Sequence, residues 1–180
     1  MTERPRVLAV DDQPDMLELI RLTLEDSFDV LTLSDPMVVS EYLDLFEPDL
    51  LLLDVMMPKL SGFQLLEVLR SRSQTQSLPV IILSAKASMG EIKHGYKIGA
   101  SLYLTKPFEP ERLLRNVRMQ VEAAGPPRPK KATITRVAED LFQTQAYQLG
   151  RAELGLGSKE REALRQRESE IRRRYKGMRR

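Results

Sequence analysis

Short apolar runs alternate with amphipathic segments five times in the first 125 residues, and this alternation limits the fold more than any other feature. The runs have the length of buried strands, and the segments between them repeat apolar residues every three or four positions, as helices do. The predicted strands cover residues 6–10, 28–33, 50–53, 80–83 and 101–104. The predicted helices cover residues 14–24, 38–46, 63–69, 89–98 and 112–121. Five strand–helix repeats predict an α/β fold, a doubly wound five-stranded parallel sheet with right-handed crossovers.

Two of the runs contain no polar residue. They are Leu50–Leu53 and Val80–Leu83. A strand without alternating polar residues is buried on both faces, so these two runs are typical of the centre of a parallel sheet.

Polar side chains follow the predicted strands at the points where the strands end. Ligands of open parallel sheets bind beyond the carboxyl ends of the strands, so these residues are candidates for a site. Strand one is followed by Asp11 and Asp12, strand three by Asp54, strand four by Ser84 and strand five by Lys106. The second strand ends at Asp35, which we expect to lie off to one side. We expect the three carboxylates, the hydroxyl and the ammonium group to converge at one edge of the sheet.

This set of groups favours phosphoryl chemistry. Carboxylates that crowd together raise one another's pKa unless a positive charge intervenes, and Lys106 supplies one. An oxygen-rich cluster without histidine also suits Mg²⁺. One carboxylate can then accept a phosphoryl group while Mg²⁺ and Lys106 offset the charge on its oxygens. The alternative is a set of unrelated turn and helix-cap residues, since Asp favours both positions.

Composition excludes several other classes of site. The chain has no cysteine and one histidine, His94, so thiol chemistry, Cys-ligated metals and multi-His centres are excluded. No apolar run approaches the roughly 20 residues that span a bilayer. The first residues, MTERPRV, lack the apolar segment of a secretory signal. We therefore expect a cytoplasmic protein that does not insert into membranes.

Charge divides the chain into two parts. Residues 1–125 carry 13 basic and 19 acidic side chains, a net charge of −6, whereas residues 126–180 carry 15 and 7, a net charge of +8. Three prolines in the four residues 126–129 favour an extended spacer. These features predict a globular domain over residues 1–124, a Pro-rich linker over residues 125–131 and a basic helical extension over residues 132–180.

The extension has an apolar stripe but little apolar surface. The stripe consists of Ile134, Val137, Ala138, Leu141, Phe142, Ala146 and Leu149. So few apolar residues hardly make an independent core. Three interpretations stay open: docking of a protein partner on the stripe, binding of nucleic acid by the arginines, or a segment that is solvated or docked on its own domain.

Four segments of the first part resemble the receiver domain of two-component response regulators, the CheY-like superfamily. They are Val7–Pro14, Leu52–Pro58 with Gly62, Ile82–Lys86 and Tyr103–Phe108. The resemblance covers residues 5–122 in order and without large gaps. It implies a flavodoxin-like receiver with the strand order 2-1-3-4-5.

The resemblance implies a role for each member of the acidic cluster. Asp54 resembles the phosphoacceptor, which takes its phosphoryl group from the phosphohistidine of a sensor histidine kinase. Asp12 and Asp54 resemble the direct Mg²⁺ ligands, Asp11 acts through water, and the backbone carbonyl of Met56 completes the protein ligands. Lys106 resembles the lysine that pairs with the phosphoryl oxygens.

The resemblance also implies a switch. Ser84 resembles the hydroxyl that moves toward the phosphoryl group, and Tyr103 the aromatic residue that rotates inward behind it. The Lys106–Pro107 peptide bond is expected to be cis. The expected output is a changed surface that binds a downstream protein, so the domain relays a signal and is not an enzyme. The alternative is a DNA-binding transcriptional regulator that uses the basic C-terminal helices.

Some of these roles have alternatives, and one feature of the family is absent. Phosphatases of the haloacid dehalogenase type also use a strand-end Asp, but they need a second Asp two residues later, where this chain has Met56. Ser84 has a simpler interpretation as a cap of the next turn, and Tyr103 as a packed aromatic residue. The acidic pair that often follows Gly-Ala in the family is Ser101-Leu102 here. We therefore do not expect dimerisation through the fourth helix, fifth strand and fifth helix.

Overall fold

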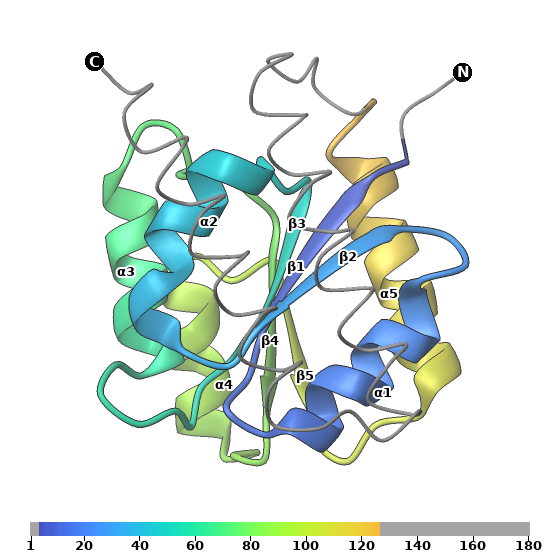
Figure 1. The fold of residues 1–180 in the computed structure, drawn as a ribbon. Coiled ribbons are helices and arrows are strands. Elements are labelled where there is room, and N and C mark those ends of the chain that lie inside the picture. The colour runs from blue at the N-terminus through green and yellow to red at the C-terminus, as the bar shows by residue number, and fades with distance from the viewer. Residues whose placement is uncertain (1–3, 127–180) are drawn as a thin grey trace, which may run out of the picture. The chain divides into compact units, whose positions relative to one another are not determined.

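The computed structural model describes residues 4–126, in which five parallel strands form one sheet between two layers of helices (Figure 1). The strands are β1 (Arg6–Val10), β2 (Asp29–Leu33), β3 (Leu50–Asp54), β4 (Val80–Ser84) and β5 (Leu102–Thr105). Their order in the sheet is β2-β1-β3-β4-β5. All five predicted strands and their predicted order are confirmed.

Helices cover both faces of the sheet. They are α1 (Pro14–Leu24), α2 (Val39–Phe46), α3 (Gly62–Ser71), α4 (Met89–Lys97) and α5 (Pro110–Ala123), with a 3₁₀ turn η1 (Pro36–Val38) before α2. Figure 1 shows α1 and α5 on one face and α2, α3 and α4 on the other. Crossovers to both faces are what the predicted doubly wound topology requires.

The predicted boundaries differ from the observed ones by two residues or fewer. Helix α5 begins at Pro110, two residues before the prediction, because proline is well placed in the first turn of a helix. Strand β5 begins one residue late, at Leu102. The reason is Ser101, whose hydroxyl accepts the Val80 N–H at 3.1 Å in place of a backbone carbonyl.

Burial separates the central strands from the edge strands. Every residue of β1, β3 and β4 is buried, whereas the outer strands β2 and β5 contain half-buried positions. The uninterrupted apolar runs of β3 and β4 therefore do lie at the centre of the sheet, as predicted. Strand β1 joins them between β2 and β3.

The start of α3 fits closely against the end of β3. Ser61 caps the helix, since its hydroxyl accepts the Gln64 N–H while the Gln64 side chain accepts the Ser61 N–H. A Cβ atom at Gly62 would lie 2.1 Å from the carbonyl oxygen of Asp54. Only glycine permits this approach, so Gly62 fixes the loop that follows Asp54.

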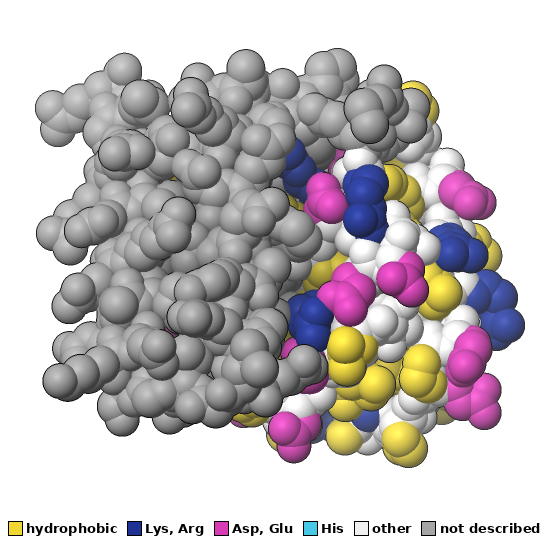
Figure 2. Space-filling model, turned by 45° about the vertical axis from the view of Figure 1, so that its right-hand side comes forward, with side chains coloured by type: hydrophobic (Ala, Val, Ile, Leu, Met, Phe, Trp, Pro, Cys, Tyr) yellow, Lys and Arg dark blue, Asp and Glu magenta, His cyan; other side chains and the backbone are white. Residues whose placement is uncertain are grey.

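The predicted linker and basic extension lie outside the described residues, apart from Gly125 and Pro126 at the start of the linker. Among residues 4–126, no helix has both the length and the apolar character that crossing a bilayer requires. Over α1 and α5, acidic and basic side chains are interspersed with hydrophobic ones (Figure 2). The net negative charge of the first part thus does not form a single acidic patch on this face.

Candidate functional site

Alternation along the strands directs the strand-end residues to two different faces of the sheet. Leu52 and Leu104 belong to the apolar core that includes α1 and α5. Asp54 and Lys106 stand two residues after them, so they continue the same side of the sheet. Ser84 and Tyr103 stand at the alternate positions of their strands. Their side chains therefore lie on the other face of the sheet, the face that α4 covers. The sequence predicted that all these residues lie at one edge of the sheet. Because side chains alternate along a strand, the residues at this edge lie on two different faces.

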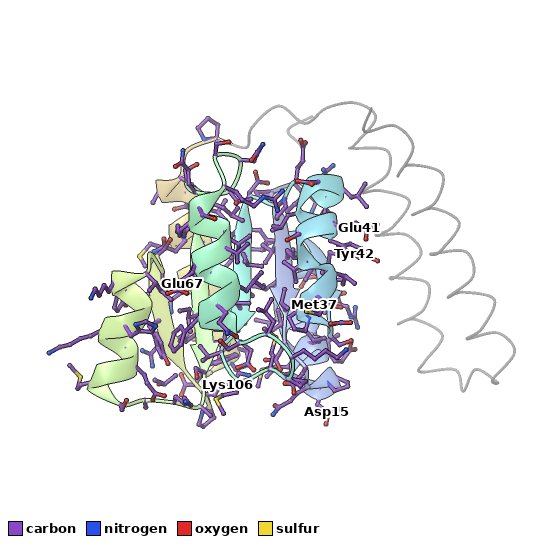
Figure 3. All side chains as sticks on the ribbon, turned by 90° about the vertical axis from the view of Figure 1, so that its left-hand side faces the viewer. Asp15, Met37, Glu41, Tyr42, Glu67 and Lys106 are labelled. Carbon is purple, nitrogen blue, oxygen red and sulfur yellow. The ribbon has the colours of Figure 1, made fainter. Side chains whose placement is uncertain are left out.

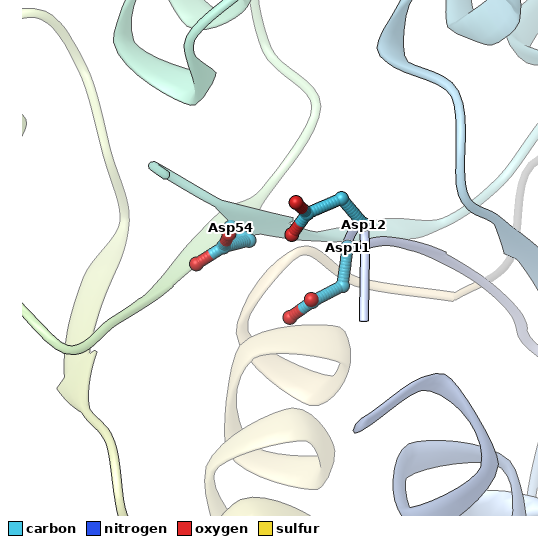
Figure 4. Close-up of side chains that lie close together, drawn as sticks. All are labelled: Asp11, Asp12 and Asp54. Atoms are coloured by element: carbon cyan, nitrogen blue, oxygen red, sulfur yellow. The ribbon is translucent and has the colours of Figure 1, made fainter. Parts of the chain in front are cut away.

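Three carboxylates come together at the ends of β1 and β3. Each of Asp11, Asp12 and Asp54 offers an oxygen atom, and these oxygens all lie within 4.8 Å of one another. Figure 4 shows the three side chains directed toward a common space. Asp11 and Asp54 are buried, with exposed fractions of 0% and 3%, and Asp12 is half-buried. The predicted acidic cluster is therefore present in the fold.

Lys106 provides the positive charge of the cluster. Its Nζ atom lies 2.5 Å from Asp11 Oδ2 and 3.1 Å from Asp54 Oδ1, and its side chain is only 11% exposed. The Lys106 N–H donates to the Ser84 carbonyl at 2.8 Å, and the Lys106–Pro107 bond is cis, as expected. Figure 3 shows Lys106 and Asp15 at the same end of the domain, the lower end in this view. One ammonium group thus bridges two buried carboxylates.

Ionisation of the Asp54 carboxyl is electrostatically unfavourable in the folded protein. Burial raises its pKa above the usual range, and the neighbouring Asp11 charge raises it further. The Lys106 ammonium acts in the opposite direction. Because desolvation is the largest cause, the charged form of Asp54 is less favourable in the folded protein than in water.

The cluster has the chemistry of a magnesium site. Its donors are carboxylate oxygens only, which suits a hard cation that keeps several water molecules. One lysine faces three carboxylates, so the cluster retains negative charge that a divalent cation would offset. Half-exposed Asp12 leaves one side of the cluster accessible to water. Met56 is the second residue after β3, and its side chain is 53% exposed.

Ser84 and Tyr103 are both buried and both bind the loop between β4 and α4. Ser84 Oγ accepts the Lys86 N–H at 3.1 Å, which is the turn-capping contact of the simpler interpretation. Tyr103 is 8% exposed, and its hydroxyl donates to the Lys86 carbonyl at 2.8 Å. The two residues are therefore linked through a single loop residue.

The sequence prediction missed the polar contacts that fix the start of α4. Ser88 caps the helix at the Glu91 N–H, and Lys86 Nζ lies 2.8 Å from Glu91 Oε1. The signal was present as Ser-x-x-Glu at residues 88–91, the pattern of a helix cap. His94 is exposed, and its ring lies edge-on to Phe63 with a centroid distance of 4.8 Å.

Comparison with known proteins identifies the same part of the chain. The family model of the response regulator receiver domain matches residues 7–118. The response regulator Rre1 of Synechocystis is 33% identical over 146 residues, which are 78% of this chain and 63% of that protein. The DNA-binding response regulator MtrA of Mycolicibacterium smegmatis is 34% identical over 121 residues, 67% of this chain and 52% of that protein. The chain thus covers less than two thirds of the length of these curated relatives.

Solved structures agree on the fold. The chemotaxis protein CheY4 of Vibrio cholerae superimposes with a TM-score of 0.62 at 30% identity, over 65% of this chain and 98% of that one. The receiver domain of the Francisella response regulator 1452 superimposes with a TM-score of 0.62 at 33% identity, over 66% of this chain and 98% of that one. Residues 7–118 of the family match contain the acidic cluster and all five strands except Arg6, the first residue of β1. This chain therefore belongs to the family of response regulator receiver domains, which are signalling proteins.

Proposed function

We propose that Asp54 accepts a phosphoryl group from the phosphohistidine of a sensor histidine kinase. One observation carries the proposal: the Lys106 ammonium lies between Asp11 and Asp54 in a buried cluster of three carboxylates. Burying a carboxylate lowers the stability of the folded protein, and this cluster contains two buried carboxylates. Such a cost is typical of a functional site rather than of a turn or helix cap.

The transfer makes one bond and breaks one. A carboxylate oxygen of Asp54 attacks phosphorus, and the bond between phosphorus and the histidine nitrogen breaks. The electron pair of that bond stays with the imidazole nitrogen. The product on this chain is an acyl phosphate, whose added oxygens lie within reach of the Lys106 ammonium. Lys106 offsets part of the charge that they bring.

The residues present fit Mg²⁺, and we assign its protein ligands to Asp11, Asp12, Asp54 and the Met56 carbonyl. When bound, the ion supplies positive charge at the phosphoryl oxygens. Asp12 and Asp54 would bind it directly, and Asp11 through water. Asp11 is otherwise held by two contacts, with Lys106 and with the Gln13 N–H at 3.0 Å.

Phosphorylation would act on the surface through Ser84 and Tyr103. The phosphoryl group adds acceptor oxygens, and the hydroxyl of Ser84, at the end of the adjacent strand β4, becomes a donor to them once it turns toward Asp54. Drawing Ser84 inward gives up its contact with the Lys86 N–H and leaves space that Tyr103 fills. The output is a shift between two surfaces that include α4 and β5. The chain turns over no free substrate, so we propose self-phosphotransfer and not an enzyme activity.

The central experiment replaces the acceptor. Asp54→Asn should abolish labelling by acetyl phosphate and binding of beryllofluoride, both in the presence of Mg²⁺. Asp35→Asn is the matched control, because Asp35 also follows a strand but serves as the cap of η1. Labelling that survives Asp54→Asn, or is lost equally in the control, would assign the acceptor to another residue.

A second variant separates labelling from the switch. Lys106→Ala keeps all three carboxylates, so phosphorylation of Asp54 should remain possible. The phosphoryl group would lose its lysine partner, and the surface around Tyr103 should no longer respond. A Tyr103 surface that responds fully in Lys106→Ala would exclude this role of the lysine.

For the output we propose the basic residues 132–180, joined to the receiver at residues 1–124 by the Pro-rich segment 125–131. One candidate partner is a downstream protein that binds the apolar stripe around Leu141. The other is DNA, which the net charge of +8 in residues 126–180 favours. The relatives MtrA and RpaA, the latter from Synechocystis, are described as DNA-binding regulators, which supports this alternative.

Comparing the full chain with one that ends at Ala124 distinguishes the two outputs. DNA affinity that falls steeply with salt and requires the extension would support the regulator. Absence of DNA binding, with protein capture that depends on Leu141 and Phe142, would support the protein partner. We place both activities in the cytoplasm, where a histidine kinase would present its phosphohistidine.

A further inference from the structure

The backbone and the side chain of Tyr103 are both bound by α4 and the loop before it. The Tyr103 N–H donates to the Tyr96 hydroxyl at 3.2 Å, and the Tyr103 hydroxyl donates to the Lys86 carbonyl at 2.8 Å. Within residues 4–126, strand β5 pairs only with β4, at the edge of the sheet. Tyr96 thus supplies a partner for an edge-strand amide from a neighbouring helix.

The ring of Tyr103 packs on a glycine of the same helix. A Cβ atom at Gly95 would lie 3.0 Å from Tyr103 Cδ2 and 3.1 Å from Ile82 Cδ1. These distances are shorter than ordinary contacts, so the ring occupies the space that a side chain at Gly95 would need. Gly95 lies inside α4, and glycine destabilises a helix relative to alanine. Room for the Tyr103 ring accounts for the glycine.

The three contacts hold Tyr103 along its whole length. They involve its amide, its ring and its hydroxyl, and all three partners precede β5 within residues 86–96. Rotation of the ring toward solvent would uncover Gly95 and release the Lys86 carbonyl. Tyr96 is itself 46% exposed, so its hydroxyl contact ties the outer surface of α4 to the strand that carries Tyr103.

We propose that Gly95 and Tyr96 form a cradle that holds Tyr103 buried, so that α4 and Tyr103 change position together. The inference rests on the proposed phosphorylation of Asp54, since that event would favour the buried ring. Gly95 and Tyr96 are positioning residues: they act through Tyr103 and touch neither Asp54 nor Lys106. By linkage, a change that disfavours the buried ring must also weaken binding of a phosphoryl analogue that favours it.

The helix contains its own control for a test. Gly90 also lies in α4, but a Cβ atom there would meet nothing within 4 Å. Gly95→Ala and Gly90→Ala therefore both replace a glycine of α4 by alanine, and they differ in the contact with Tyr103. The full chain, carrying 3-fluorotyrosine, is titrated with beryllofluoride in the presence of Mg²⁺. The ¹⁹F resonance that Tyr103→Phe removes reports the position of the ring.

Gly95→Ala should move the Tyr103 resonance toward its solvent-exposed position before beryllofluoride is added. The beryllofluoride concentration at half-saturation should rise about tenfold, the effect of a steric cost of ~1.4 kcal/mol. Gly90→Ala should match the wild type in both measurements. Equal resonances and equal midpoints in the two alanine variants would overturn the proposal.

Two further results keep the test decisive. If Gly95→Ala does not fold, Tyr96→Phe replaces it: exchange of the Tyr103 amide should become about tenfold faster, the effect of a ~1.4 kcal/mol loss of protection. Unchanged exchange would then overturn the cradle. If the wild type does not bind beryllofluoride, the proposed function fails, whereas the Tyr103 resonance of the two alanine variants still decides the cradle.

Discussion

The two sides of the sheet hold their strand-end residues by different forces. On the side of α1 and α5, Asp11, Asp54 and Lys106 form a buried group of charges that pair with one another. On the side of α4, Tyr103 is held by single hydrogen bonds and by packing on Gly95. The contacts that fix the start of α4, such as Lys86 with Glu91, are exposed to solvent.

This difference supports the proposal that one domain contains both a fixed site and a movable surface. Buried charges are expensive to separate, because each would be left without a partner in a poorly solvated place. Exposed ion pairs and single hydrogen bonds contribute little net stability, since water replaces them readily. The acidic cluster should therefore stay in place while the region around α4 and Tyr103 shifts.

The largest expected effect comes from removing the charge of Lys106. Lys106→Met keeps much of the side-chain volume but leaves two buried carboxylates unpaired, so the free energy of unfolding should fall by about 3 kcal/mol at pH 7. Urea denaturation measures it. The loss should shrink as the pH falls, because the Asp54 carboxyl, whose pKa is raised by burial, then becomes neutral. Lys86→Met, which removes an exposed ammonium, should change stability far less, and an equal loss would contradict the comparison.

Magnesium should have the next largest effect. At a concentration ten times its Kd, Mg²⁺ should stabilise the fold by about 1.4 kcal/mol, because it binds only the folded cluster. Thermal unfolding with and without EDTA measures the change. Asp12→Asn removes a predicted ligand from the accessible side and should abolish most of the stabilisation. Stabilisation that persists in Asp12→Asn would place the ion elsewhere.

Replacing Asp54 should stabilise the metal-free protein. Its raised pKa means that the folded state binds a proton more tightly than the unfolded state, so ionisation of Asp54 costs stability above that pKa. Asp54→Asn removes this cost and should raise the free energy of unfolding at pH 7 by about 1 kcal/mol. The gain should disappear as the pH falls and the wild-type carboxyl becomes neutral. A gain that does not depend on pH would contradict the electrostatic cause.

The smallest effect is expected on the side of α4. Tyr103→Phe removes the hydrogen bond to the Lys86 carbonyl and should cost about 0.5 kcal/mol, since the loop around Lys86 is open to water. Thermal unfolding of the two proteins in parallel measures the cost. A loss as large as that of Lys106→Met would mean that the α4 side is held as rigidly as the charge cluster.

The sequence predicted the fold and most of the acidic cluster because both depend on local patterns. Runs such as Leu50–Leu53 reveal buried strands, and the polar residue behind each run marks the edge of the sheet. It did not predict the cradle of Tyr103, because a glycine within a helix indicates only a weakness of that helix. The contact that explains Gly95 comes from another strand, and only the packed structure contains it.

The role of Ser84 shows a similar limit. Its capping contact with the Lys86 N–H could be predicted from the sequence, since serine after a strand commonly binds the next turn. Its place on the opposite side of the sheet from Asp54 depends on the phase of two strands that pair side by side. Leu83 pairs with Asp54 in the β3–β4 register, and Ser84 stands one residue further along.

The sequence by itself determined which residues stand at strand ends, because apolar periodicity and chain breaks are properties of neighbouring residues. Tertiary structure decided which of them meet. Lys106 contacts Asp11 across 95 residues of sequence, because β1, β3, β4 and β5 lie side by side in the sheet. The order and register of strands follow from the burial of the whole core, and they gather separate polar residues into the acidic cluster on one face and place Ser84 and Tyr103 on the other.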